Sequence, residues 1–193
     1  MALEAVKSGE GVLLLVPGNR EVGGIMMTTK FETTFGSLGD FSKGELEIIN
    51  DDPKNYVFSN IFDVASRSRP YEKVVVAINL GYVFETLRAE GTSTWFAAAH
   101  DEFAIVMDGV VAVDLVKLDA PDAVVPPGQR GAIAVEGTPV GRKMGYVKCK
   151  RGHQVLLPKG AAYRFRADKP GVILLQTVDG ALSVHKWADI CYK

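Results

Sequence analysis

Short apolar runs separated by turn residues fill the chain from about residue 70 onward. Runs of this length and spacing are typical of a sandwich or a barrel built from short strands. We therefore predict an all-β protein with a jelly-roll β-barrel, an architecture of about eight strands. The nine predicted strands span residues 73–78, 94–98, 102–107, 110–116, 132–135, 145–149, 154–157, 162–165 and 171–176.

The first seventy residues carry a weaker pattern and many aromatic side chains. Residues 1–8 and 58–66 predict short helices, whereas residues 9–50 contain many glycines and threonines without a clear period. An apolar segment with so little pattern packs against something larger. That surface is either the chain's own barrel or a second subunit.

Length and composition set the domain count and exclude one class of partner. A chain of 193 residues that is 47% hydrophobic can bury one well-packed core. We expect a single domain over residues 1–193, with an extended N-terminal arm at 1–70 and the barrel at 71–193. Lysine and arginine total 22 against 23 acidic residues, so the formal charge is −1 and no concentrated basic face is expected. Nucleic acid is therefore excluded as a partner.

Cysteine usage and hydropathy indicate the compartment. Cys149 and Cys191 lie far apart in the sequence and in no metal-binding spacing, so we expect free thiols. No stretch approaches the roughly 18 apolar residues of a membrane span, and the N-terminus lacks the pattern of a signal peptide. We expect a soluble cytoplasmic protein without a membrane partner.

Two groups of turn residues have a physical reason for their positions. Asp108 and Gly109 lie between two apolar runs, which predicts a hairpin with a type I′ turn and positive φ at both residues. Pro158 and Gly160 bracket a predicted tight turn between the runs at 155–157 and 161–165. These positions specify the backbone and require no chemistry from their side chains.

The spacing of these residues resembles the cupin family. The cupin pattern is G-x5-H-x-H-x3,4-E-x6-G, followed downstream by G-x5-P-x-G-x2-H-x3-N, and its three histidines and one glutamate bind one metal ion. The matching positions in this chain are Glu102, Gly109, Gly152, Pro158, Gly160 and Tyr163. The resemblance covers residues 91–167 and implies a cupin-type barrel.

The resemblance also implies that the metal-binding set is lost. The two paired histidine positions fall on Trp95 and Ala97, or on Phe96 and Ala98, and the third falls on Tyr163. Only Glu102 remains of the four ligands, so we expect no metal and no other cofactor in this chain. We expect a partner for the Glu102 carboxylate, because an unpaired charge inside a barrel is costly. The candidate partners are Arg142, Tyr163, Arg164 and Arg166.

A rearranged metal site is the alternative interpretation. His100 and Glu102 are two residues apart and would point to one face of an extended strand. His153 or His185 could complete a set of two histidines and one carboxylate, which suits non-haem iron(II). Against this set, His100 and His153 both fall in predicted turns, where their side chains would be exposed.

Among cupins without the ligand set, the chain resembles the small subunits of two-component hydroquinone 1,2-dioxygenases. The resemblance rests on its size, its aromatic N-terminal arm, its degenerate motifs and the ending Lys-Trp-Ala-Asp-Ile-Cys-Tyr at 186–192. It implies an α2β2 assembly in which a larger cupin subunit holds Fe(II) and cleaves hydroquinone with O2, in the degradation of 4-substituted phenols. This chain would then support the catalytic subunit without being catalytic itself. Trp95 and Trp187 are the candidate pocket or interface residues.

Two other functions stay open. One is a stand-alone cupin that uses the rearranged site at His100, Glu102 and His153. The other is a metal-free cupin that binds a small aromatic molecule or a sugar inside the barrel.

Overall fold

A computed structural model describes residues 36–41, 50 and 60–186. The predicted helix at 1–8, most of the arm, Trp187 and Cys191 lie outside these residues. The division into arm and barrel stays a prediction. No helix among the described residues is long and apolar enough to cross a membrane.

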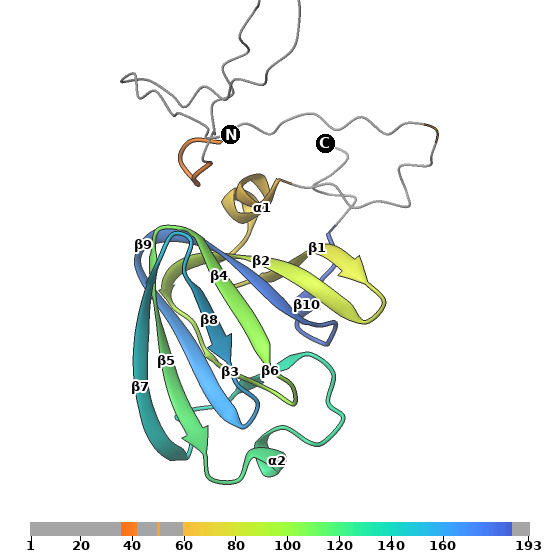
Figure 1. Ribbon diagram of the computed structural model, residues 1–193, viewed down its shortest axis with the longest axis vertical. Coiled ribbons are helices and arrows are strands. Elements are labelled where there is room, and N and C mark those ends of the chain that lie inside the picture. Colours follow the sequence, from red (N-terminus) through yellow and green to blue (C-terminus); the bar gives the residue numbers. More distant parts are fainter. Residues whose placement is uncertain (1–35, 42–49, 51–59, 187–193) are drawn as a thin grey trace, which may run out of the picture. The chain divides into compact units, whose positions relative to one another are not determined.

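The fold is all-β, and its described residues form two short helices and one curled sheet (Figure 1). All nine predicted strands are present, and the last two form a single long strand. The elements are α1 (Ile61–Arg67), β1 (Lys73–Asn79), β2 (Tyr82–Thr92), β3 (Trp95–Ala98), β4 (Glu102–Asp108), β5 (Val110–Leu118), α2 (Pro121–Val124), β6 (Ala132–Val135), β7 (Gly141–Lys150), β8 (Gln154–Leu157), β9 (Ala161–Val178) and β10 (Ser183–Val184).

The sequence pattern missed strand β2. Its inward positions follow the period of two expected for a strand, at Val83, Glu85, Leu87 and Ala89, and all four side chains are buried. A glutamate at an inward position breaks the apolar pattern by which a strand is recognised. The short strand β10 lies in the segment after residue 180 and pairs in parallel with β1.

Strand β9 is the longest element and connects the rest of the sheet. Its first half pairs with β5 and, at Arg166 and Ala167, with the end of β2, whereas its second half pairs with β2 on one edge and β4 on the other. Strand β3 also pairs with the first half of β9 and continues the sheet to β6. Figure 1 shows the strands curling around one interior, which the side chains of the main core cluster fill.

Helix α1 covers part of the outer face of this sheet. It begins at an N-cap, Asn60, whose side chain accepts hydrogen bonds from the amides of Phe62 and Asp63. Val64 packs on Val74 and Val76 of β1. The helix predicted over residues 58–66 is therefore confirmed at 61–67.

The corner at Gly109 differs from the predicted hairpin. Strands β4 and β5 meet there but do not pair with each other, because they pair with opposite halves of β9. Gly109 has a φ of +76°, whereas Asp108 has no positive φ, so the type I′ turn was wrong and the positive φ at the glycine is confirmed. A Cβ atom at Gly109 would lie 3.1 Å from the Cα of Gly171. The corner requires glycine both for its conformation and for this close approach.

The predicted turn at Pro158–Gly160 is confirmed between β8 and β9. The amide of Ala161 donates to the carbonyl of Pro158 over 3.1 Å, and Gly160 has a φ of +79°. The Gly160 carbonyl accepts a hydrogen bond from the amide of Leu118 over 3.0 Å, which attaches the turn to the end of β5.

Valine at Gly109 or Gly160 should destabilise the protein, because a β-branched residue at positive φ costs about 1–3 kcal/mol. Gly109→Val should lower the melting temperature more, since its Cβ would also press on Gly171, whereas at Gly160 the nearest atom lies at 3.8 Å. Thermal melts followed by circular dichroism measure both. Gly39→Val is the control, because a Cβ there meets nothing within 4 Å. Unchanged melting of both variants would contradict a backbone role for these glycines.

Candidate functional site

The two cupin-motif side chains that face the interior are Glu102 and Tyr163. Glu102 begins β4 and is 0% exposed, and Tyr163 lies near the start of β9 and is 2% exposed. The motif residues Gly109, Gly152, Pro158 and Gly160 lie in the connections between strands instead. The motif therefore divides into a buried pair and a set of turn residues.

Of the two alignments of the paired histidine positions, the one on Phe96 and Ala98 places a side chain in the interior. The Phe96 ring belongs to the main core, with its centroid 5.8 Å from that of Tyr163. Trp95 points to the other face of β3, where its ring lies 4.5 Å from the Arg164 guanidinium carbon. Phe96, Glu102 and Tyr163 are thus the matched positions that meet inside the barrel.

A lysine that the sequence analysis did not identify lies among these residues. Lys73, the first residue of β1, is only 3% exposed. Its Nζ atom lies 3.5 Å from the Tyr163 hydroxyl and 4.9 Å from the centre of the Phe96 ring. A buried ammonium needs anionic or aromatic neighbours to replace its lost hydration, and here it has both kinds.

Glu85 supplies the nearest negative charge. Its Oε2 lies 3.5 Å from the Lys73 Nζ, and its Oε1 accepts a hydrogen bond from the Ser183 hydroxyl over 2.6 Å. Burial raises the pKa of Glu85, and the charge of Lys73 offsets part of this rise. Lys73 and Glu85 therefore form a buried ion pair, and the Ser183 hydroxyl of β10 helps to hold the carboxylate in place.

Glu102 is the second carboxylate of the cluster. Neither of its oxygens accepts a hydrogen bond of good geometry from the described residues. Burial, followed by the charge of Glu102, raises the pKa of Tyr163 well above its ordinary value, so the phenol stays protonated. We name Lys73, Glu85, Glu102 and Tyr163 the interior cluster.

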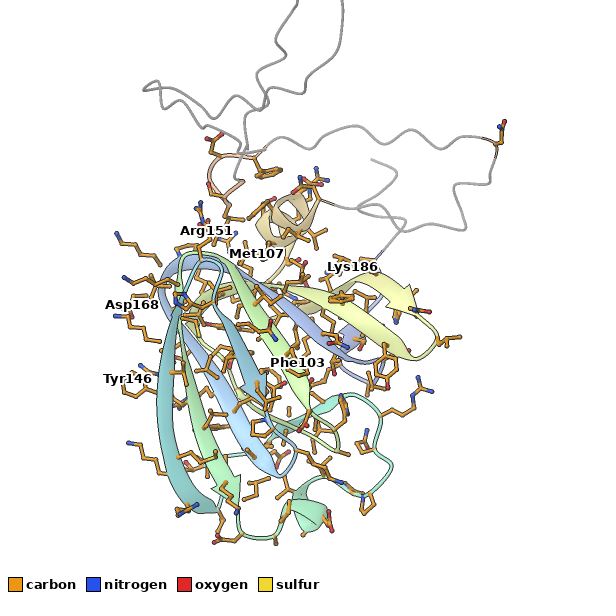
Figure 2. The ribbon with its side chains drawn as sticks, in the orientation of Figure 1. Phe103, Met107, Tyr146, Arg151, Asp168 and Lys186 are labelled. Carbon is orange, nitrogen blue, oxygen red and sulfur yellow. The ribbon has the colours of Figure 1, made fainter. Side chains whose placement is uncertain are left out.

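A pocket of about 410 Å³ reaches the interior cluster from outside. Lys73 and Phe96 line it, together with residues from the start of β1 and from the segment around β10. At its edge Glu72 binds both Arg69, over 3.1 Å, and Lys186, over 2.7 Å. Lys186 is labelled in Figure 2.

The expected arginine partners of Glu102 bind elsewhere, so this part of the prediction was wrong. Arg164 and Arg166 both donate to Asp114, with three of the four distances at 2.8 Å and one at 3.1 Å. Hydrogen bonds from Arg166 and then Arg164 hold the pKa of Asp114 below its usual value. Arg142 lies exposed on β7. Only Tyr163 of the four candidates lies near Glu102.

The rearranged metal set is not assembled in this structure. His100, Glu102 and His153 are all described, and no group of three or more histidine, cysteine or acidic side chains among the described residues could hold a metal ion. His153 is exposed, as expected, and contacts the Lys150 carbonyl. His100 is half-buried, contrary to expectation, and its Nε2 lies 3.0 Å from the Thr177 hydroxyl.

Sequence reasoning could have found Lys73 and Glu85 from one signal. Each is a charged residue at an inward position of a strand that is otherwise apolar at those positions. A cation and an anion at such positions on consecutive strands predict a buried pair. The pairing of Val75 with Glu85 brings the two side chains into range.

Solved structures related to this chain include two at high identity. One is the crystal structure of hydroquinone 1,2-dioxygenase PnpCD in complex with Cd2+ and 4-hydroxybenzonitrile, at 60% identity and a TM-score of 0.78, covering 86% of this chain and 99% of the matched one. The other is hydroquinone 1,2-dioxygenase from Sphingomonas sp. TTNP3 with 4-hydroxybenzoate bound, at 54% identity and a TM-score of 0.79, covering 83% and 97%.

A third match concerns a different, longer chain. In the structure of PnpCD in complex with Fe3+, a chain at 13% identity and a TM-score of 0.54 matches 73% of this chain but only 39% of its own length. At this identity the likeness shows a shared fold alone. No protein-family model and no curated protein sequence matches this chain.

The curled all-β sheet and the spacing of its turn residues define a cupin-type jelly-roll barrel. The two high-identity matches then fix the family within that class. This chain belongs to the family of the shorter chains of hydroquinone 1,2-dioxygenases.

The interior cluster does not fit a metal ion. A cupin ligand set needs several neutral histidines, whereas here the matched positions hold Phe96 and Tyr163, and both rings lie beside the positively charged Lys73 ammonium. We predict that the purified chain binds no iron, manganese or zinc tightly. Elemental analysis after dialysis should give far less than one metal ion per chain. His100→Ala and His153→Ala should change nothing. Near one metal ion per chain, lost in either variant, would contradict this prediction.

Proposed function

We propose that this chain is the non-catalytic small subunit of an Fe(II)-dependent hydroquinone 1,2-dioxygenase. The larger cupin subunit holds the iron and cleaves the ring, adding both atoms of O2 to hydroquinone during the degradation of 4-substituted phenols. The observation that carries this proposal is the 60% identity over nearly the full length of a chain of such an enzyme. The presence of a second, longer chain type with the same fold in PnpCD supports a heteromeric assembly, for which α2β2 is the expected stoichiometry.

The contents of the barrel support the non-catalytic role. An enzyme that activates O2 at iron needs open coordination positions around the metal. In this chain the corresponding space holds packed side chains, including Phe96, Tyr163 and Phe165, and the Lys73 ammonium. The same packing argues against the alternative of a ligand bound inside the barrel.

An exposed apolar row on the outer face of the sheet supports contact with a partner. The strand registers align Phe84 of β2, Gln176 of β9, Phe103 of β4 and Leu156 of β8. Phe84, Phe103 and Leu156 are 42%, 37% and 45% exposed. Single exposed apolar residues are ordinary, but three large ones on neighbouring strands, interrupted by Gln176 alone, are typical of a surface that another molecule covers.

Helix α1 covers the neighbouring part of the same face. Figure 2 labels Met107, which packs under α1, and Phe103, four residues earlier on the same strand and beyond the helix. A shallow pocket of about 260 Å³ lies between Phe84, Phe103 and Leu174. Four of the six described residues that line this pocket are apolar and the other two are Gln154 and Gln176, so it suits a largely apolar group of the larger subunit.

Co-expression with the larger subunit tests the proposed function. We expect a soluble complex that cleaves hydroquinone, measured as O2 uptake, whereas neither chain shows this activity alone. We expect the activity to depend on this chain because it would help to position the wall of the substrate pocket in the complex. A shift of about 1 Å in such a wall can reduce the rate about a hundredfold. A larger subunit that is fully active without this chain would contradict the proposal, as would activity of this chain by itself.

A charge in the apolar row should weaken the complex. Phe103→Asp places a carboxylate in the centre of the row and should raise the dissociation constant at least about tenfold, as expected for a buried aromatic contact. Val140→Asp is the matched control, because Val140 is 77% exposed in the connection between β6 and β7. Analytical ultracentrifugation or calorimetry measures both. If Phe103→Asp leaves the dissociation constant of the complex unchanged, the row is not the interface.

A further inference from the structure

Two of the three matched ligand positions inside the barrel place an aromatic ring beside an ammonium group. Phe96 and Tyr163 stand at matched histidine positions, and both rings face the Lys73 Nζ, at 4.9 and 5.9 Å from their centres. Glu102, at the matched glutamate position, acts electrostatically on Tyr163 and on Glu85. The cation comes from β1, a strand outside both motifs.

The charges of the interior require such a cation. Glu85 and Glu102 are 1% and 0% exposed, so their carboxylates lose nearly all hydration. Two buried carboxylates without a positive charge would repel each other and bear the full desolvation penalty. In metal-binding cupins a metal ion meets this requirement. Here Lys73, at 3% exposure, is the buried cation of the interior cluster.

The backbone positions this lysine specifically. Lys73 pairs with Ser183 in the parallel register of β1 and β10. The Ser183 hydroxyl in turn donates to Glu85, which orients the carboxylate whose other oxygen faces the Lys73 Nζ. Three neighbouring strands therefore hold the ion pair, and its geometry does not depend on a flexible surface side chain.

We infer that the Lys73 ammonium is an internal counterion that replaces the cupin metal ion and allows Glu85 and Glu102 to remain inside the barrel. Its charge is the essential property, since the space itself could be filled by any side chain of similar length. The ammonium also lines the pocket of about 410 Å³, so a metal ion that reached the interior cluster from that side would meet a positive charge there. This inference concerns the chain's own interior and does not depend on the proposed subunit role.

Removal of the charge with retention of the shape tests the inference in the full chain. Lys73→Met keeps an unbranched side chain and should lower the melting temperature by about 10 °C, because breaking a buried pair leaves uncompensated charge. Lys186→Met is the matched control. It removes an ammonium 2.7 Å from Glu72, but this lysine is 32% exposed, so the melting temperature should change by no more than about 2 °C. A Lys73→Met protein that melts within about 2 °C of wild type would overturn the inference.

Neutralising the carboxylates should suppress the defect. Lys73→Met/Glu102→Gln and Lys73→Met/Glu85→Gln should each recover at least half of the lost melting temperature, although each glutamine variant alone lowers it. Such coupling between charges is what a double-mutant cycle detects, and simple loss of packing would give additive effects. If the Lys73→Met protein does not fold, the inference still requires that at least one of the two double variants folds. Failure of both double variants to recover stability would overturn the inference.

The pH dependence provides a second readout. The groups that face Glu85 are Lys73, Glu102, Tyr163 and the Ser183 hydroxyl. Burial raises the pKa of Glu85, and loss of Lys73 raises it further, so the folded state binds more protons than the unfolded state above the ordinary glutamate range. Stability then falls as the pH rises, and the defect of Lys73→Met should be smaller at pH 5.5 than at pH 8. An equal or larger defect at pH 5.5 would contradict the counterion role.

Discussion

The pairing of strand β9 with four other strands is the constraint on which the rest of the fold depends. This strand of 18 residues pairs with β2 along both halves, with β3 and β5 along its first half, and with β4 along its second half. Because β4 pairs with residues 172–176 of β9 and β5 pairs with residues 161–166, β4 and β5 can follow each other in sequence without pairing. Gly109 then makes the corner that brings the chain from one half to the other, against Gly171 of β9 itself.

The same strand carries the centre of the interior. Tyr163 and Phe165 on β9 pack edge to face, and they contact Phe96 of β3 and Tyr71 of the connection before β1. The polar part of this interior is small but unusual, since an ammonium and two carboxylates lie within an apolar core. A core of this kind is stable only if each charge meets an opposite charge, a hydroxyl or an aromatic ring. Lys73 and Glu85 meet this condition through each other, the Ser183 hydroxyl and the rings of Phe96 and Tyr163.

This interior suggests how a barrel can keep its fold after it loses metal chemistry. The turn glycines and Pro158 specify the backbone and are independent of a metal ion. Glu102 is different, because a carboxylate retained in the interior needs a cation. Among the described residues, the outer face of the sheet, where Phe84, Phe103 and Leu156 lie exposed, offers one apolar surface for recognition.

The sequence by itself determined the all-β class, the positions of most strands, helix α1 and the turns at Gly109 and Pro158–Gly160. These features depend on local signals, namely the alternation of apolar and polar residues and the conformational freedom of glycine. Strand β2 escaped detection because Glu85 occupies an inward position, and its partner Lys73 lies on another strand. The hairpin predicted at Asp108–Gly109 was wrong because β4 and β5 each pair with β9, and a local turn signal does not reveal such pairing with a distant strand. Only the tertiary structure decided that Glu102 shares its surroundings with Lys73 and that the arginines bind Asp114, because such pairings depend on which faces of distant strands meet.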